Sequence, residues 1–418
     1  MDSGQATVTL SRMGCYAEDH AVHLDEDLPD MTNDIVYTIF LIFTGAAVFA
    51  TLALFARQAL LVAYILLGTL LGPSGLGLVT DPDLIRGIAD IGIMFLLFLL
   101  GLNLQPQDLL RMARKTTLVT LGSSLACFLL AAGLAWLFGY RWGEALLIGA
   151  VAGFSSTIIG LKLLPTTVLH HQRMGEIIIS ILLLQDLIAI ALLLLLGAGG
   201  ENGVPLYRLV LLLASLPVLA LFAFVMERWV LTPLIRRFDT IREYVFLLAI
   251  GWCLGLAELA RLLGLSHEIG AFIAGVSLAS GPVALFVAES LKPLRDFFLV
   301  MFFFSIGASF DPRMLPLVLA PALAIGLSLL ALKPWVFRWL LARTGEKPDT
   351  GLEIGFRLGQ MSEFSLMVAV LAWEQGVIGR QAAYLIQVST VLTFLVSTYL
   401  IVLRYPTPIA VSADLRRD

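Results

Sequence analysis

Long apolar stretches alternate with short polar breaks along the chain from residue 35 to residue 403. A helix of about 20 apolar residues crosses the roughly 30 Å hydrocarbon layer of a membrane. The pattern therefore predicts thirteen membrane-spanning helices, several of them short enough to be tilted or broken. Their approximate limits are 35–56, 59–72, 84–103, 117–138, 145–164, 176–197, 205–227, 243–263, 268–289, 294–310, 315–342, 352–374 and 380–403. Glycine and proline in the breaks, as at 72–75, mark the helix ends.

Composition agrees with a protein whose main solvent is lipid. Hydrophobic residues make up 59% of the 418 residues and charged residues 14%, whereas a soluble domain has roughly 25% charged residues. The net charge of -4 and the scattered arginines leave no basic face, which argues against nucleic acid as a partner. Cys15, Cys127 and Cys253 show neither disulfide nor zinc spacing. The fold class expected is an all-α integral membrane protein in contact with lipid.

Lysine and arginine are unequally divided between alternate loops, with eighteen in one set and seven in the other. Because cytoplasmic loops retain positive charge, this predicts an external N-terminus and a cytoplasmic tail at 404–418. Residues 1–34 lack the pattern of a signal peptide, and we interpret them as a polar extramembrane segment. Met31 lies just before the first helix, so a later start codon is an equally consistent interpretation.

Two motifs recur at one offset of 206 residues. In the first, Asp90, Gly101 and Pro106 of the third stretch are matched by Asp296, Gly307 and Pro312 of the tenth. In the second, the pattern Ile-Gly-x-x-x-Gly-x-x-Ser begins at Ile148 and again at Ile354. The offset moves the chain seven helices along, and an odd displacement reverses direction across the membrane. We predict two inverted six-helix repeats, 35–197 and 243–403, joined by a linker helix at 205–227, as in many secondary transporters.

The fifth and twelfth stretches carry glycine and hydrogen-bonding residues in mid-span, Gly-Phe-Ser-Ser-Thr at 153–157 and Gly-Gln-Met-Ser-Glu at 359–363. Broken backbone within a membrane is tolerated where it lines a cavity or is buried in protein. Close packing of two helices through small residues is the alternative. If the helices are broken, the candidate ion-binding side chains are Ser155, Ser156, Thr157, Gln360, Ser362 and Glu363.

Gln185 and Asp186 lie at the centre of the sixth stretch. A carboxylate there costs about 2.5–3.5 kcal/mol on insertion scales, so a functional interpretation is the default. A proton and a monovalent cation that compete for one carboxylate would give an exchanger, because only the loaded site is neutral enough to cross. The alternative is an aspartate that bonds a facing serine or backbone amide and locks two helices together.

Other charged residues point less clearly to transport. Arg357 in the twelfth stretch either pairs with a residue on another helix or flanks the ion cavity, and neither interpretation is favoured. Asp90 and Asp296 lie near the ends of their stretches, which favours helix capping or a salt bridge over transport. His267 and Glu268 open the ninth stretch at the predicted outer surface, where pH sensing is the less favoured interpretation.

Four motifs together carry a family resemblance: Phe-Ser-Ser-Thr at 154–157, Gln-Asp-Leu-Ile-Ala at 185–189, Gly-Ala-Phe-Ile-Ala-Gly at 270–275 and Gly-Gln-Met-Ser-Glu-Phe at 359–364. They resemble the transport domain of Kef-type potassium:proton antiporters in the monovalent cation:proton antiporter-2 group. The resemblance implies a sodium/proton antiporter fold, a homodimer in a bacterial inner membrane, and elevator movement of a core in which two broken helices cross beside Asp186. Gln185 implies K⁺ at Asp186, with Na⁺ as the alternative.

The sequence departs from that family in its regulatory parts. Kef-type proteins continue into a cytoplasmic nucleotide-binding domain, but no phosphate-binding glycine loop occurs here, so no cofactor is expected. The family's acidic regulatory loop is matched only by Glu289 and Ser290. A constitutive exchanger, a separate cytoplasmic regulatory subunit and truncation of a longer protein are all consistent with these departures.

Three other functions remain open: an ion channel, an intramembrane aspartyl protease that pairs Asp186 with Glu363, and a transport-inactive sensor. A channel needs repeated weak sites along a path, and such a protease needs two close carboxylates. For the favoured antiporter, Gln185 cannot ionise and 301–310 carries no charge, whereas relatives that move net charge tend to have a lysine there. We therefore expect electroneutral exchange of one cation for one proton.

Overall fold

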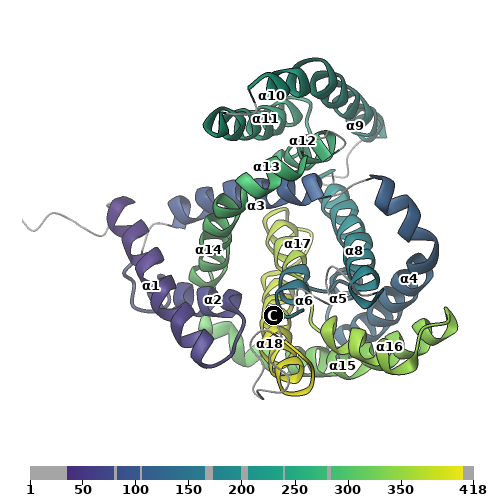
Figure 1. Ribbon diagram of the computed structural model, residues 1–418. Helices are drawn as coiled ribbons and strands as arrows, with labels where there is room; N and C mark the ends of the chain where they lie inside the picture. The colour runs from purple at the N-terminus through teal and green to yellow at the C-terminus, as the bar shows by residue number, and fades with distance from the viewer. Residues whose placement is uncertain are drawn as a thin grey trace, which may run out of the picture.

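The computed structural model describes residues 35–79, 82–103, 106–164, 173–198, 206–238, 241–279 and 284–407. Its regular elements in these ranges are helices (Figure 1). In chain order they are α1 (Ile35–Phe55), α2 (Leu60–Leu71), α3 (Pro82–Asn103), α4 (Pro106–Leu137), α5 (Trp142–Ala152), α6 (Thr157–Lys162), α8 (Arg173–Ala198), α9 (Leu206–Met226), a π-helical turn (Glu227–Leu231), α10 (Thr232–Phe238), α11 (Arg242–Leu262), α12 (His267–Ala279), α13 (Ala284–Ser290), α14 (Lys292–Ala308), a 3₁₀ turn (Pro312–Met314), α15 (Leu315–Arg343), α16 (Pro348–Arg357), α17 (Glu363–Glu374) and α18 (Arg380–Arg404). The predicted polar segment 1–34 and residues 408–418 of the tail lie outside the described residues.

Each predicted stretch coincides with one helix or with two helices in series. Within the described ranges, eight segments are long and apolar enough to cross a membrane by length and composition. The helices α2 and α12 are apolar but shorter. The all-helical membrane fold is thus confirmed, while the count of thirteen crossings stays a prediction.

The helices pack as two groups (Figure 1). In one group α12 crosses α3, α14 packs against both α2 and α3, and α11 covers α12. In the other, α15 packs against α4, α16 and α18, while α8 lies against α4 and α17. Figure 1 shows α17 of the second group near the centre of the view. We call the second group the core.

Glycine contacts show the internal repeat in three dimensions. Gly101 of α3 lies against the backbone of Phe272 in α12, and Gly307 of α14 lies against the backbone of Ile65 in α2. Neither position has space for a Cβ, which lets the helix backbones approach closely. Because these glycines are 206 residues apart, the crossing of α3 with α12 recurs as the crossing of α14 with α2.

Two spans of the core are broken, as the sequence predicts. The first break separates α5 from α6 and the second separates α16 from α17. Ser156 caps α6 by accepting the N–H of Ile159 at 3.1 Å, and Ser362 caps α17 by accepting the N–H of Phe364 at 3.1 Å. Such hydroxyl caps satisfy the first amides of a helix. The two caps are also 206 residues apart, so the breaks are equivalent positions of the repeat.

Candidate ion site at the crossing of two broken helices

Asp186 lies on α8 beside the first break. Its side chain is only 1% exposed, and the hydroxyl of Thr157 donates to Oδ2 at 3.0 Å. Thr157 is the first residue of α6, so the carboxylate lies at the beginning of that helix. A carboxylate so far from water needs a neutralising proton or cation, since isolated buried charge is strongly disfavoured.

Glu363 adds a second carboxylate on the other side of the α6 start. It is the first residue of α17, is 8% exposed, and accepts the N–H of Ile158 on Oε1 at 3.4 Å. Among the described residues its buried Oε2 has no hydrogen-bond partner. Thr157, which donates to Asp186, and Ile158, which donates to Glu363, are adjacent residues, so both carboxylates are bonded to the start of α6.

Gln185 braces the first break. Its Oε1 accepts the N–H of Ser155 at 3.1 Å, and its Nε2 donates to the carbonyl of Gly153 at 3.1 Å. These backbone groups lack helical partners because the helix is interrupted there, and a neighbouring side chain replaces the missing bonds. A role for Gln185 in ion binding stays a prediction alongside this bracing role.

Lys333 of α15 is a functional candidate that the sequence interpretation missed. It is 1% exposed, and its Nζ donates to the carbonyl of Phe154 at 3.0 Å, to Oγ of Ser155 at 3.2 Å and to the carbonyl of Gln360 at 2.8 Å. An ammonium has three donors, so all of them are used. The amine joins both breaks at the ends of α5 and α16, where the helix dipoles favour positive charge.

A signal for Lys333 exists in the sequence. It is a charged residue inside the apolar stretch 315–342, which also contains Arg338, and a charge inside an apolar stretch is the feature that singled out Asp186. The count of lysine and arginine in the loops did not include Lys333, because it lies within a helix. The predicted absence of charge at 301–310 does hold in the sequence, but the next helix brings a lysine to the crossing.

Lys333 also marks a place where the two repeats differ. Gly149 packs against Phe128 of α4, and Gly355 packs against Pro334 of α15, two contacts related by the same 206 residues. The counterpart of Lys333 in the first repeat is then Cys127, which is also buried.

The remaining polar residues of the second break hold its backbone in place. Gln360 donates to the carbonyl of Arg357 at 3.0 Å and accepts the hydroxyl of Ser397 at 2.8 Å. Arg357 is 1% exposed, pairs with Glu353 at 2.8 Å, and donates to the carbonyl of Leu163 at 3.0 Å. These contacts give Gln360 and Arg357 structural roles, while ion binding by Gln360, Ser155, Ser156 or Ser362 stays a prediction.

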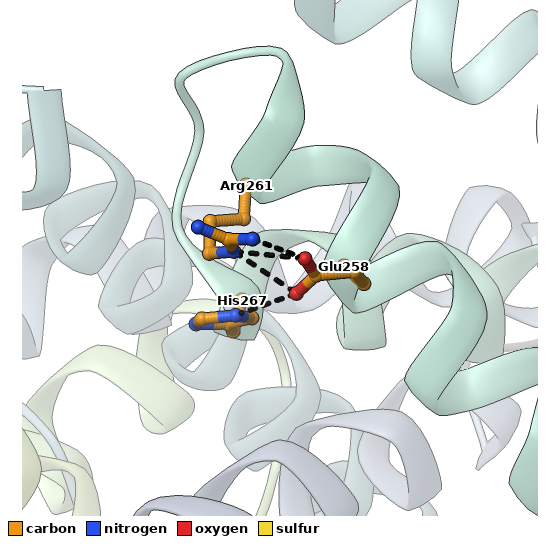
Figure 2. Close-up of polar contacts among 3 residues, drawn as sticks. All are labelled: Glu258, Arg261 and His267. Atoms are coloured by element: carbon orange, nitrogen blue, oxygen red, sulfur yellow. Dashed lines mark hydrogen bonds and ion pairs between the residues drawn. The ribbon is translucent and has the colours of Figure 1, made fainter.

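The other candidate charges lie away from the crossing. Figure 2 shows His267 at the start of α12, with Nε2 at 3.3 Å from Oε2 of Glu258, which also pairs with Arg261. This group is exposed and does not include Glu268. Asp296 pairs with Arg295 at 3.0 Å, and Asp90 lies on α3. The side chain of Glu289 falls outside the described residues.

The sequence pattern of the family described as "Sodium/hydrogen exchanger, transmembrane" matches residues 38–403. The chain belongs to this family. Among curated relatives, the chain is 32% identical to a putative K⁺ efflux antiporter KefB of Alkalimonas amylolytica, over 81% of its own length and 52% of the relative's. It is 31% identical to the glutathione-regulated potassium-efflux system protein KefC of Cronobacter sakazakii, over 82% and 56%. The resemblance to Kef-type transport domains is confirmed, and the chain spans about half the length of these relatives.

The fold of this chain is similar to that of the sodium proton antiporter MjNhaP1 from Methanocaldococcus jannaschii. The TM-score is 0.66 at 18% identity, and the match covers 87% of this chain and 95% of the other. Asp186 and Glu363 are bonded to the adjacent residues Thr157 and Ile158, so the aspartyl protease hypothesis stays open. Membership of a transporter family favours transport over that alternative.

Proposed function

We propose that this exchanger moves K⁺ in one direction and H⁺ in the other, with both ions binding in turn at Asp186. The observation that supports this most is a buried carboxylate at the first break, bonded to Thr157, with the carboxylate of Glu363 bonded to the next residue, Ile158. Hydroxyl and carboxylate oxygens are hard ligands of the kind that alkali cations take. The named functions of the Kef relatives support K⁺ as the cation.

We propose a stoichiometry of one cation to one proton. Gln185 cannot ionise, and both ends of its amide contact the backbone of the break. Lys333 donates to three oxygens, none of which belongs to a carboxylate, so loading Asp186 does not require a Lys333 ion pair to break. Glu363 is the residue whose titration would add a second proton to the transport cycle and change this stoichiometry.

Elevator movement of the core in a homodimer completes the proposal. The bonds of Lys333, Ser155 and Gln360 tie α5, α15 and α16 together at the crossing, which supports movement of the core as one body. The N-terminus would be external and the tail cytoplasmic in a bacterial inner membrane. A separate cytoplasmic regulatory subunit is part of the same proposal and follows from the Kef resemblance.

The direct test is dye-monitored exchange in proteoliposomes, with K⁺, Na⁺, Li⁺ and Rb⁺ compared at several pH values. We expect K⁺ and Rb⁺ to drive proton movement at lower concentrations than Na⁺ and Li⁺. The reverse order would support Na⁺/H⁺ exchange, which the family description and the MjNhaP1 fold favour as the second candidate. Flux that proceeds without proton coupling would indicate a channel instead.

A further inference from the structure

A cavity of about 320 Å³ opens between α2, α6 and α14. Its polar lining consists of Gln58, Tyr64 and Asp296, and its apolar lining includes Leu299 and Ile158. At about 30 Å³ for each water molecule, this space holds a hydrated cation with several waters around it. The cavity lies outside the bonds that form the crossing, so the site described above does not account for it.

A hydrogen bond connects the wall of this cavity to the ion site. Ile158 lines the cavity and donates its N–H to Glu363, and the preceding residue, Thr157, donates to Asp186. Gln58 is 8% exposed, and within the described residues its buried Oε1 has no hydrogen-bond partner. Gln58 is part of the cavity wall, and Ile158 connects that wall to the carboxylate of Glu363.

A second, smaller cavity of about 50 Å³ lies between α3, α8, α12 and α17, and three carboxylates line it: Asp90, Glu268 and Glu374. Three of its lining residues are counterparts of residues in the larger cavity at an offset of 206: Asp90 with Asp296, Ile93 with Leu299, and Ser266 with Leu60. The internal repeat therefore relates the two cavities. One is wide and the other holds only one or two waters, as expected when one of two alternating routes is open.

We propose that Asp296 and Asp90 are the cation-capturing carboxylates of these two routes, with Asp296 serving the route that is open in this structure. The proposal rests on cation:proton exchange as the function. Asp296 is 57% exposed and pairs with Arg295, so the mouth of the open route is locally neutral. Removing its charge leaves Arg295 alone at the mouth, which repels an approaching cation and lowers its local concentration.

The first test is exchange measured separately from each membrane face, in right-side-out and inside-out vesicles. Asp296→Asn should raise the KM for K⁺ by about threefold to tenfold at one face, with little change in kcat or in the KM at the other face. Asp90→Asn should act only at the opposite face. Asp349→Asn removes an exposed charge of α16 outside both cavities and serves as the matched control. Equal effects at both faces, or a change confined to kcat, would overturn the proposal.

The second test uses thiol labelling and does not depend on flux. Leu299 lines the cavity and is otherwise buried, so Leu299→Cys should react with a small membrane-impermeant maleimide from one face only. Cys15 is replaced by Ser in this background, while Cys127 and Cys253 are buried. The positive-inside pattern predicts that Leu299→Cys reacts from the cytoplasmic face.

Potassium should slow the labelling of Leu299→Cys, and adding Asp296→Asn should raise the K⁺ concentration required by about threefold to tenfold. An unprotected or unreactive Leu299→Cys would overturn the assignment of the open route. A wild-type protein that exchanges no cation would instead defeat the proposed function, and labelling with K⁺ protection would still decide whether Asp296 captures cations.

Discussion

In the first repeat α6 begins at Thr157 behind the cap Ser156, and in the second α17 begins at Glu363 behind the cap Ser362, 206 residues later. The surrounding glycine contacts repeat in the same way. The charged side chains beside the breaks do not repeat. Asp186 has Leu392 as its counterpart, and Lys333 has Cys127.

This difference separates two requirements of transport. A repeated backbone frame supplies two equivalent arrangements, which alternating access needs. A single ion site, in contrast, requires its charges to be unequally divided, because copying Asp186 into the second repeat would bury another negative charge without a partner. The two repeats therefore share the backbone frame that would move, and they differ in the side chains that would bind the ion.

The largest effect is expected when the carboxylate of Asp186, which only the first repeat carries, is removed. Asp186→Asn should abolish cation-driven proton movement, because an amide neither releases a proton nor neutralises a cation. Thermal stability in detergent and oligomeric state should remain near wild type. The same dye assay on Asp349→Asn checks that loss of a carboxylate elsewhere is harmless. Wild-type flux in Asp186→Asn would remove the central claim.

Lys333→Met makes the second repeat more like the first, which is apolar at Cys127. The carbonyls of Phe154 and Gln360 would each lose a donor, and an unsatisfied buried group costs about 1–3 kcal/mol. We expect a loss of roughly 2–4 kcal/mol in unfolding free energy and reduced exchange, measured by thermal unfolding and by flux. Cys127→Ala is the control at the equivalent position and should cost less. Equal losses in both variants would argue against a bond network special to Lys333.

Gly355→Ala tests the frame that the repeats share. Its Cβ would collide with the backbone of Pro334, and forcing extra volume into a packed interface costs about 1–3 kcal/mol. Gly149→Ala should behave alike, because its contact with Phe128 is equivalent. Gly133→Ala in α4 has open space and should leave stability unchanged or slightly raised. Unfolding midpoints that do not separate the first two variants from the third would contradict equivalent packing.

The smallest expected effect is the response to voltage. We predict that the K⁺ gradient at which proton flux vanishes is the same at two clamped membrane potentials. Net movement of one charge would shift that balance by about 2.3 kcal/mol per 100 mV. A shifted null point would show that a second group titrates, and Glu363→Gln would then be expected to restore voltage independence if Glu363 is that group.

The sequence was sufficient for the backbone frame because its signals are local or periodic. Apolar length located the helices, and one offset of 206 residues revealed the repeat. Mid-span Gly-Phe-Ser-Ser-Thr marked the first break, and the cost of a lone carboxylate in lipid identified Asp186 as a candidate. Each of these signals depends on a few neighbouring residues or on a fixed spacing, so none required knowledge of the fold.

The separate roles of the polar residues at the breaks could not be predicted from the sequence. Ser155 donates to the carbonyl of Leu358 and accepts from Lys333, partners that are 203 and 178 residues away. Gln360 and Ser397 are likewise joined across 37 residues. A hydroxyl or amide near a break has similar chemistry whether it binds an ion or holds the backbone, and only the position of its partners distinguishes the two roles.

The close approach at Gly101, Gly149, Gly307 and Gly355 has a consequence for natural variation. Every amino acid other than glycine adds a Cβ, and at each of these positions that atom would lie within 3 Å of a neighbouring helix backbone. Any missense change in these four codons therefore disturbs the packing of two helices, whatever the new side chain is. Working copies of this gene should drift freely at lipid-facing leucines while remaining fixed at these four codons.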